Sequence, residues 1–267
     1  MPIFQLFLVA IIQGITEFLP VSSSGHLILL PYFTGLQDQG QIIDVAVHIG
    51  TLFAVVLFFW RDVSLCISGL PRLLSGRIDS PGSKLSFLLI IATIPVLIVG
   101  VILKFTGLVD LMRSITVIGW TMLVFGILLY WADRRGPLVK SDGDWTTKDA
   151  VILGLWQAVA LIPGTSRSGI VITGARALGY DRTGAAKIAM LMSIPTIIAS
   201  GVFLGVEVIA TADTAAARDG AIAAAFSFMA ALVALSLMMR LLRTVSYTPY
   251  VIYRIILGLG LLWVAYT

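Results

Sequence analysis

Long apolar segments separated by short polar ones dominate the chain. Six of them approach the length of about 20 residues that a transmembrane helix needs. They are rich in Ala, Gly and Leu and lack the period-two alternation of barrel strands, so we expect helices. The predicted spans cover residues 42–60, 85–104, 115–132, 186–206, 220–239 and 250–267.

Two further apolar stretches are interrupted halfway. Residues 3–19 end at Pro20 and a run of serines, and residues 151–162 end at Pro163 and the segment G-T-S-R-S-G. Each is followed by another short apolar piece, at 26–36 and at 170–179. Two half-length helices joined by Pro, Ser and Gly predict a re-entrant hairpin, because irregular backbone at membrane depth must be surrounded by protein or line a water-filled cavity.

The composition supports a multi-pass membrane protein. Hydrophobic residues make up 58% of the 267 positions and charged residues 12%, whereas soluble domains carry about 25% charged residues. A single cysteine and two histidines exclude a disulfide framework and argue against a zinc site with several ligands. The net charge of +4 reflects Lys and Arg in loops, so it does not indicate a nucleic-acid partner.

The distribution of Lys and Arg predicts the orientation. If the N-terminus lies outside, the outer connections hold Lys104, Arg113 and Arg218, and most of the other basic residues fall in the inner connections. Cytoplasmic loops carry this excess of positive charge. We therefore expect both termini outside, with the first hairpin entering from the outer side and the second from the inner side.

The two hairpins also resemble each other in sequence. Q-G-I-T-E-F-L-P-V-S-S-S-G (13–25) aligns with Q-A-V-A-L-I-P-G-T-S-R-S-G (157–169), and A-T-I-P (92–95) recurs as M-S-I-P (192–195). Chance similarity is the alternative to a duplication. Hairpins that enter from opposite faces predict an inverted-topology repeat, in which broken helices meet near the midplane and form the binding site. We expect a single all-α integral membrane domain (1–267), with repeats of approximately 1–132 and 150–267.

Polar residues concentrate at the first interruption. Gln13 and Glu17 are four residues apart and share a helix face. Pro20 ends that helix, and a carboxylate inside a membrane is costly unless it is paired or hydrated. The residues that follow can cap or begin the next helix: Ser22, Ser23, Ser24, Gly25 and His26.

The second interruption places Arg167 among the hydroxyls of Thr165, Ser166 and Ser168, just before a helix start. Helix starts offer free N–H donors and a positive dipole end. The planar guanidinium of arginine donates two parallel hydrogen bonds to phosphate. The two interruptions together predict an anion pocket.

Phosphoryl transfer would use these parts. Ser23 is a candidate nucleophile, with His26 as its base or as the acid for the leaving group, and His26 itself is the alternative nucleophile. Glu17 can accept a proton, orient the histidine or bind a divalent cation that bridges to phosphate. The structural alternatives are serines that only tighten helix packing, and Glu17 with Arg167 as one buried ion pair.

Several residues outside the interruptions have simpler interpretations. Asp44 and His48 could line a pocket entrance, but an interfacial helix start is the favoured interpretation. Arg254 lies one turn into the last span and can snorkel to the interface. The aromatic residues near span ends are expected to be interface anchors: Trp60, Tyr130, Trp131 and Tyr247.

The motif Q-G-I-T-E-F-L-P-V-S-S-S-G-H, followed by D-V-A-V-H-I-G-T, P-G-T-S-R-S-G and S-I-P-T, resembles the bacterial undecaprenyl-pyrophosphate phosphatase family associated with bacitracin resistance. The resemblance covers nearly the whole chain. It implies a membrane enzyme that converts C55 polyprenyl pyrophosphate to the monophosphate lipid carrier of cell-wall synthesis, in a cleft that opens outward. The family motifs fall on Gln13 and Glu17; on Ser22, Ser23, Gly25 and His26; and on Gly164, Thr165, Ser166, Arg167 and Ser168.

The resemblance also implies dependence on a divalent cation, Mg²⁺ or Ca²⁺, with Glu17 as its candidate ligand. Gln13 replaces the first acidic residue of the family motif, which weakens any scheme with two carboxylates on a metal. The expected partners are the polyprenyl pyrophosphate and the bilayer of the bacterial inner membrane, and association as a homodimer stays open. A transporter or lipid flippase is the rival class, because it also uses broken helices, and a structural scaffold ranks last.

Overall fold

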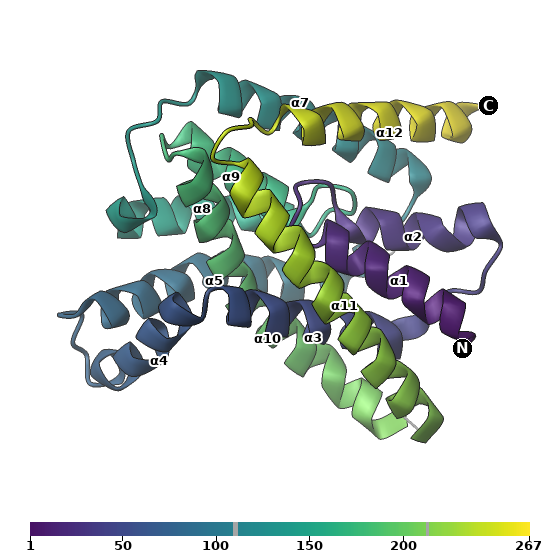
Figure 1. Cartoon of the computed structure of the whole chain (residues 1–267), viewed down its shortest axis with the longest axis horizontal. Coiled ribbons are helices and arrows are strands. Elements are labelled where there is room, and N and C mark those ends of the chain that lie inside the picture. The colour runs from purple at the N-terminus through teal and green to yellow at the C-terminus, as the bar shows by residue number, and fades with distance from the viewer. Residues whose placement is uncertain (109–111, 212–213) are drawn as a thin grey trace.

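A computed structural model describes residues 1–108, 112–211 and 214–267, and the side chains of these residues apart from 204–211. In these ranges the chain folds into helices joined by turns, without a β-strand (Figure 1). The prediction of an all-α membrane protein is confirmed.

Six helices in the described part of the chain are long and apolar enough to cross a bilayer, as the hydrophobic pattern predicts. The candidate spans are α3 (Gly40–Phe58), α5 (Pro81–Thr106), α7 (Ile115–Arg135), the Arg182–Phe203 part of α10 (Arg182–Thr211), α11 (Thr214–Leu241) and α12 (Thr248–Tyr266). Several outward faces carry exposed apolar side chains, such as Ile94, Ile98 and Ile102 on α5. Such a surface suits contact with lipid chains.

Both interrupted stretches are broken helices, in agreement with the sequence. The first comprises α1 (Ile3–Thr16) and α2 (Ser23–Thr34), and the second comprises α8 (Thr147–Val159) and α9 (Arg167–Ala177). The helices of each stretch pack against each other. None of the four has the length of a span, because about 20 residues are needed to cross the hydrocarbon region.

Residues 61–74, which fall in the connection after the span predicted at 42–60, form helix α4 together with Trp60 (Trp60–Leu74). Arg61 and Asp62 share this segment with Leu65, Ile67 and Leu70, so the helix is amphipathic and does not qualify as a span. It lies against α5 where Gly69 meets Gly82, and a side chain on either glycine would strike the other helix's backbone. A short 3₁₀ turn, η1 (Asp142–Asp144), precedes α8.

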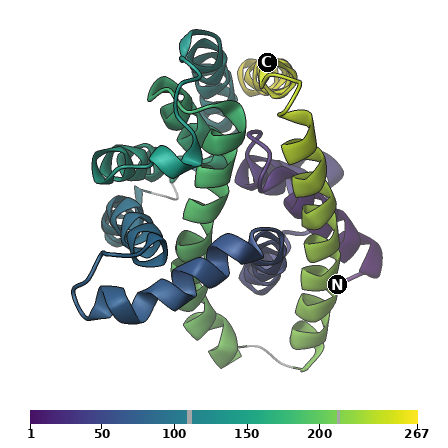
Figure 2. The same ribbon diagram turned by 60° about the vertical axis from the view of Figure 1, so that its left-hand side comes forward.

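One helix of each broken pair packs against a long helix from the other half of the chain. Helix α1 packs along α11 of the second half, and α8 packs along α5 of the first half. The last helices of the halves, α7 and α12, lie against each other (Figures 1 and 2). This reciprocal packing is compatible with the predicted repeat, and both the repeat and the orientation of the halves in the bilayer stay predictions.

One sequence match offered for the repeat does not lie on corresponding elements. A-T-I-P (92–95) is on α5, the second span of the first half, whereas M-S-I-P (192–195) is on α10, the first span of the second half. Both segments place a proline inside a membrane helix. Their similarity is therefore not evidence for the repeat.

A buried ion cluster ties the ends of four helices together. Asp133 at the end of α7 accepts hydrogen bonds from Arg176 of α9 (3.1 Å) and Arg182 of α10 (2.8 Å), and also from the backbone N–H of Tyr247 (3.3 Å). The charge distribution assigns Arg176 to an inner connection, yet its side chain is 1% exposed. The neighbouring carboxylate and backbone carbonyls compensate its burial.

Of the four expected interface anchors, Trp60, Tyr130 and Trp131 are exposed, whereas Tyr247 is fully buried. The Tyr247 hydroxyl donates to the carbonyl oxygen of Arg182 at 2.8 Å. This tyrosine fixes the start of α12 against α10, so the expectation of an interfacial role is wrong for it.

Candidate active site

The two helix breaks, residues 17–22 between α1 and α2 and residues 160–166 between α8 and α9, end in the same local conformation. Ser22 and Ser166, the residues before α2 and α9, have φ values of 75° and 71°, and in the described ranges no other non-glycine residue has a positive φ. The hydroxyl of Ser22 accepts from the N–H of Gly25 (3.3 Å), and that of Ser166 accepts from the N–H of Gly169 (3.1 Å). This conformation is costly for L-residues, by about 1–3 kcal/mol each, and such strain concentrates at functional sites.

Pro163 and Gly164 shape the second break. Proline lacks a backbone N–H and disfavours helix in the residue before it. Gly164 follows with φ +85°, and a Cβ there would lie 2.2 Å from the hydroxyl of Thr121. Only glycine fits this turn, which brings Arg167 to the start of α9.

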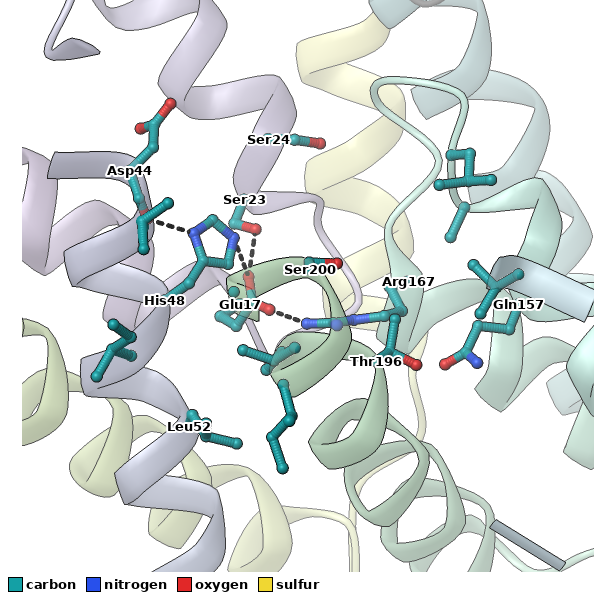
Figure 3. Close-up of a pocket in the computed structure, with 18 of the residues that line it drawn as sticks. Glu17, Ser23, Ser24, Asp44, His48, Leu52, Gln157, Arg167, Thr196 and Ser200 are labelled. Carbon is teal, nitrogen blue, oxygen red and sulfur yellow. Dashed lines mark hydrogen bonds and ion pairs between the residues drawn. The ribbon is translucent and has the colours of Figure 1, made fainter. Parts of the chain in front are cut away.

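An ion pair joins the two breaks. The Arg167 guanidinium from α9 contacts Oε1 of Glu17, which follows α1, and the Glu17 side chain is 3% exposed (Figure 3). Oε2 of the same carboxylate accepts from Ser23 Oγ at 2.6 Å and from Gln13 Nε2 at 2.8 Å. The structure therefore brings together four residues that the sequence singled out, three from the first hairpin and one from the second.

A cavity of about 740 Å³ opens beside this ion pair. Ser22, Ser23, Ser24 and Ser166 contribute hydroxyls to its wall, and Arg167 contributes its guanidinium. Apolar side chains from α3, α5 and α10 line the remainder: Val45, Ile49, Leu52, Val96, Ile197, Ile198 and Val202. The cavity thus has a polar end at the two breaks and an apolar side between spans.

The other predicted phosphate-binding residues lie behind the wall of the cavity. Ser168 donates to the carbonyl oxygen of Leu19 (3.0 Å), which links the two breaks directly. Gly25 serves as the backbone donor to Ser22. The buried Oγ1 of Thr165 has no hydrogen-bond partner within the described ranges. These residues support the cavity wall without facing it.

His26 is the predicted residue that the geometry sets apart. Its Nδ1 lies 2.6 Å from the carbonyl oxygen of Ser22, and its Nε2 lies 2.5 Å from the hydroxyl of Tyr253 on α12. The ring stacks on that of Tyr253 and does not line the cavity. Both nitrogens are engaged away from Ser23, so the structure does not form the expected Ser23–His26 pair, and a catalytic role of His26 stays a prediction.

His48 and Asp44 lie on the cavity wall, although the sequence favoured an interfacial helix start for them. Nε2 of His48 is 3.8 Å from Oε2 of Glu17. Their spacing of four residues on α3 was visible in the sequence. Their distance from the first hairpin was not, because it depends on how α3 packs against α1.

Arg254 of α12 does not snorkel to the interface. It is fully buried, and its guanidinium donates to the carbonyl oxygen of Pro20 in the first break (3.2 Å) and to that of Thr165 in the second (2.9 Å). Its remaining hydrogen bonds go to carbonyl oxygens of Gly164, Thr121 and Met122. A single side chain therefore fastens both breaks to each other and to α7.

Comparison with known proteins finds similar sequences over nearly the whole chain. A family model described as "Bacitracin resistance protein BacA" matches residues 6–260. Two proteins named undecaprenyl-diphosphatase, from Jannaschia sp. (strain CCS1) and Ruegeria pomeroyi, are each 71% identical over the full length of both chains. Undecaprenyl-diphosphatase 1 of Rhodospirillum rubrum is 43% identical over all of this chain and 96% of its own length.

The substitution Arg254→Lys tests whether the hydrogen bonds of Arg254 stabilise the two helix breaks. Lysine keeps the charge but cannot reach five carbonyl groups, and buried acceptors left without donors destabilise the fold by about 2 kcal/mol or more. We expect the thermal unfolding midpoint of the purified protein in detergent to fall by roughly 4–8 °C. Arg240→Lys, at an exposed position on α11, is the matched control. Equal midpoints for the two variants would contradict the assignment.

Proposed function

The chain belongs to the bacitracin resistance protein BacA family, and from this premise we infer that it is an undecaprenyl-diphosphatase. It is a membrane hydrolase that removes the terminal phosphate of C55 polyprenyl pyrophosphate and releases orthophosphate. The product is the monophosphate carrier lipid used for cell-wall synthesis. The observation that carries this conclusion is the Glu17–Arg167 pair with Ser23 at the polar end of a cavity whose side is apolar.

The cavity matches the two parts of such a substrate. The guanidinium of Arg167 and the hydroxyls at the two breaks suit the pyrophosphate, because charge develops on its oxygens during transfer. The apolar wall between α3, α5 and α10 suits the start of a polyprenyl chain. A carrier that moves an ion or a lipid across the membrane would not need a hydroxyl held at 2.6 Å from a buried carboxylate.

We propose Ser23 as the nucleophile and Glu17 as its base. Ser23 Oγ already donates a hydrogen bond to Glu17 Oε2, which is the atom that would accept its proton. Oγ would attack the terminal phosphorus, and the bridging oxygen would leave with the polyprenyl phosphate. Water would then release orthophosphate from the serine. His26 is the alternative nucleophile, although its nitrogens face Ser22 and Tyr253 in this structure.

In this scheme Arg167 binds two anionic groups in turn, the Glu17 carboxylate and the terminal phosphate. It neutralises Glu17 before substrate enters, and its fork then turns toward the terminal phosphate. Removal of a cation from a buried carboxylate is unfavourable unless another group compensates. Ser23 and Gln13 remain as hydrogen-bond donors to Glu17 when Arg167 moves.

A divalent cation is a proposal with partial support from the donor set. Among the described residues no group of three His, Cys, Asp or Glu could hold a metal ion. Mg²⁺ often uses only one or two carboxylates together with substrate phosphates. Glu17 would supply oxygen ligands, as would the buried Oε1 of Gln13, which has no hydrogen-bond partner among the described residues. The ion would add positive charge to the pyrophosphate.

The orientation in the membrane is likewise a proposal. We place both termini outside in a bacterial inner membrane, with the site open to the outer face. The cavity is lined by residues 44–52, which extend from near the start of α3 to just past its midpoint, and by residues 196–202, from the middle of α10 toward its end. Both segments lie toward the outer side in the orientation that the loop charges favour.

Phosphate release from C55 pyrophosphate by the purified protein in detergent tests the function. Hydrolysis needs no sealed bilayer, whereas transport does, so release in detergent separates the enzyme from the rival carrier. We expect release that falls when a chelator is added and returns with Mg²⁺ or Ca²⁺. Release that is insensitive to chelator would remove the cation from the proposal while leaving the hydrolase.

Arg167→Lys should reduce kcat/KM by at least about 10³-fold, because it loses the bidentate contact with the phosphate. Arg167→Ala should abolish turnover. Arg72→Lys, an exposed arginine on α4, controls for the exchange itself. Near-normal phosphate release by Arg167→Lys, with the protein eluting as a folded species in size-exclusion chromatography, would rule out the anion site.

A covalent intermediate would identify the nucleophile. Rapid acid quenching during turnover, followed by peptide mass spectrometry, should place a phosphoryl group on Ser23, and Ser23→Ala should remove it. A phosphoryl group on His26 would instead support the alternative. The absence of any adduct in a turning-over enzyme would favour direct attack by water.

A further inference from the structure

Gln157 of α8 holds a buried hydrogen-bond acceptor that lacks a donor in the described ranges. The residue is fully buried and lines the cavity. Its Nε2 donates to the carbonyl oxygen of Ala92 on α5 at 3.4 Å, whereas its Oε1 has no partner among the described residues. A reversed amide would place its oxygen against that carbonyl oxygen, so Oε1 is the atom that remains. A buried acceptor without a donor is unfavourable, so its place beside the cavity needs an explanation.

The sequence alignment of the two hairpins relates Gln157 to Arg167. The aligned pairs are Gln13 with Gln157, Glu17 with Leu161, and Ser23 with Arg167. In the first hairpin the side chains at positions 13 and 23 both reach the side chain at position 17. The second break ends in the same conformation as the first. By this correspondence Gln157 and Arg167 flank Leu161, and all three residues line the cavity.

Arg167 has Glu17 and Gln157 on opposite sides. Figure 3 shows the Glu17 carboxylate on one side of the guanidinium and the Gln157 amide on the other, with the amide oxygen turned toward Arg167. A guanidinium has five N–H donors, and the contact of Arg167 within the described ranges is the ion pair with Glu17. The cation therefore has donors for an acceptor on its second side.

We propose that Gln157 is a positioning residue that holds Arg167 in its phosphate-binding position. This rests on the proposed function, in which the guanidinium leaves Glu17 for the terminal phosphate. Gln157 Oε1 then accepts a hydrogen bond from one N–H of Arg167, and the other N–H groups form the fork that binds the phosphate oxygens. Arg167 is held by Glu17 in the empty site and by Gln157 in the occupied one.

A neutral acceptor suits this second position. A carboxylate there would compete with the phosphate for the guanidinium and would repel the pyrophosphate, because like charges repel strongly where water is scarce. Leu161 stands where the first hairpin has Glu17, and the described lining from the second hairpin contains no carboxylate. The amide can therefore orient the cation without neutralising it.

Gln157→Met tests the assignment, because methionine keeps the length of the side chain but removes the amide. Gln5→Met is the matched control. Gln5 of α1 is also buried and donates from Nε2 to a carbonyl oxygen, that of Gln37 at 2.8 Å, but it does not line the cavity. We expect kcat/KM for phosphate release from C55 pyrophosphate to fall about tenfold in Gln157→Met, the effect of one hydrogen bond to a charged group. The control should change it by less than about twofold.

The Arg167→Lys background separates positioning from packing. A compact ammonium lacks the planar fork that spans the phosphate and Gln157 Oε1. Adding Gln157→Met to Arg167→Lys should therefore change kcat/KM by less than about twofold, because the two residues act as one unit. Gln157→Asn is a second variant that keeps an amide but draws it back by one methylene group, and it should lose kcat/KM as Gln157→Met does.

Unchanged kcat/KM in both Gln157→Met and Gln157→Asn would overturn the assignment. A tenfold loss that persists in full on the Arg167→Lys background would overturn it as well, since Gln157 would then act on another group or on the fold. A wild-type protein that releases no phosphate would contradict the proposed function itself, so the two failures are distinguishable.

Discussion

Free carbonyl groups at membrane depth are the constraint on which this structure depends. Each broken helix leaves backbone oxygens without intrahelical partners, and the bilayer offers no water to satisfy them. Arg254 solves this for both breaks with one guanidinium, which reaches Pro20 and Thr165 together. The charge of Arg254 remains buried because five carbonyl dipoles surround it. The breaks are therefore a braced element that can hold strained residues such as Ser22 and Ser166.

Because the helix breaks are held in place, a polar site can be stable inside an apolar protein. Glu17 is buried, and it is stabilised by one cation and two neutral donors from separate segments. In the proposed reaction the Glu17–Arg167 ion pair must open, because the guanidinium that neutralises Glu17 is also the group that suits the phosphate. Nε2 of His48 lies 3.8 Å from Oε2 of the same carboxylate.

Most of the architecture could be predicted from hydrophobic pattern alone. Six spans and two broken stretches follow from the length and interruption of apolar runs, because a bilayer imposes a fixed thickness on any helix that crosses it. The hydrophobic pattern did not predict helix α4, because its mixture of leucine with Arg61 and Asp62 matches neither a span nor a loop. The buried roles of Arg176 and Tyr247 escaped it too, because a charge or an aromatic ring near a span end usually faces the interface.

The residues at the breaks, and their suitability for an anion, were determined by the sequence itself: proline, serine and glycine end helices locally, and Arg167 is the only cation among them. Which of these residues meet was decided by the tertiary structure. Glu17, Ser23 and Arg167 converge, His26 turns to Tyr253, and His48 takes the place beside the carboxylate. The physical reason is that helix ends are set by short-range backbone chemistry, whereas contacts between hairpins depend on how distant helices pack.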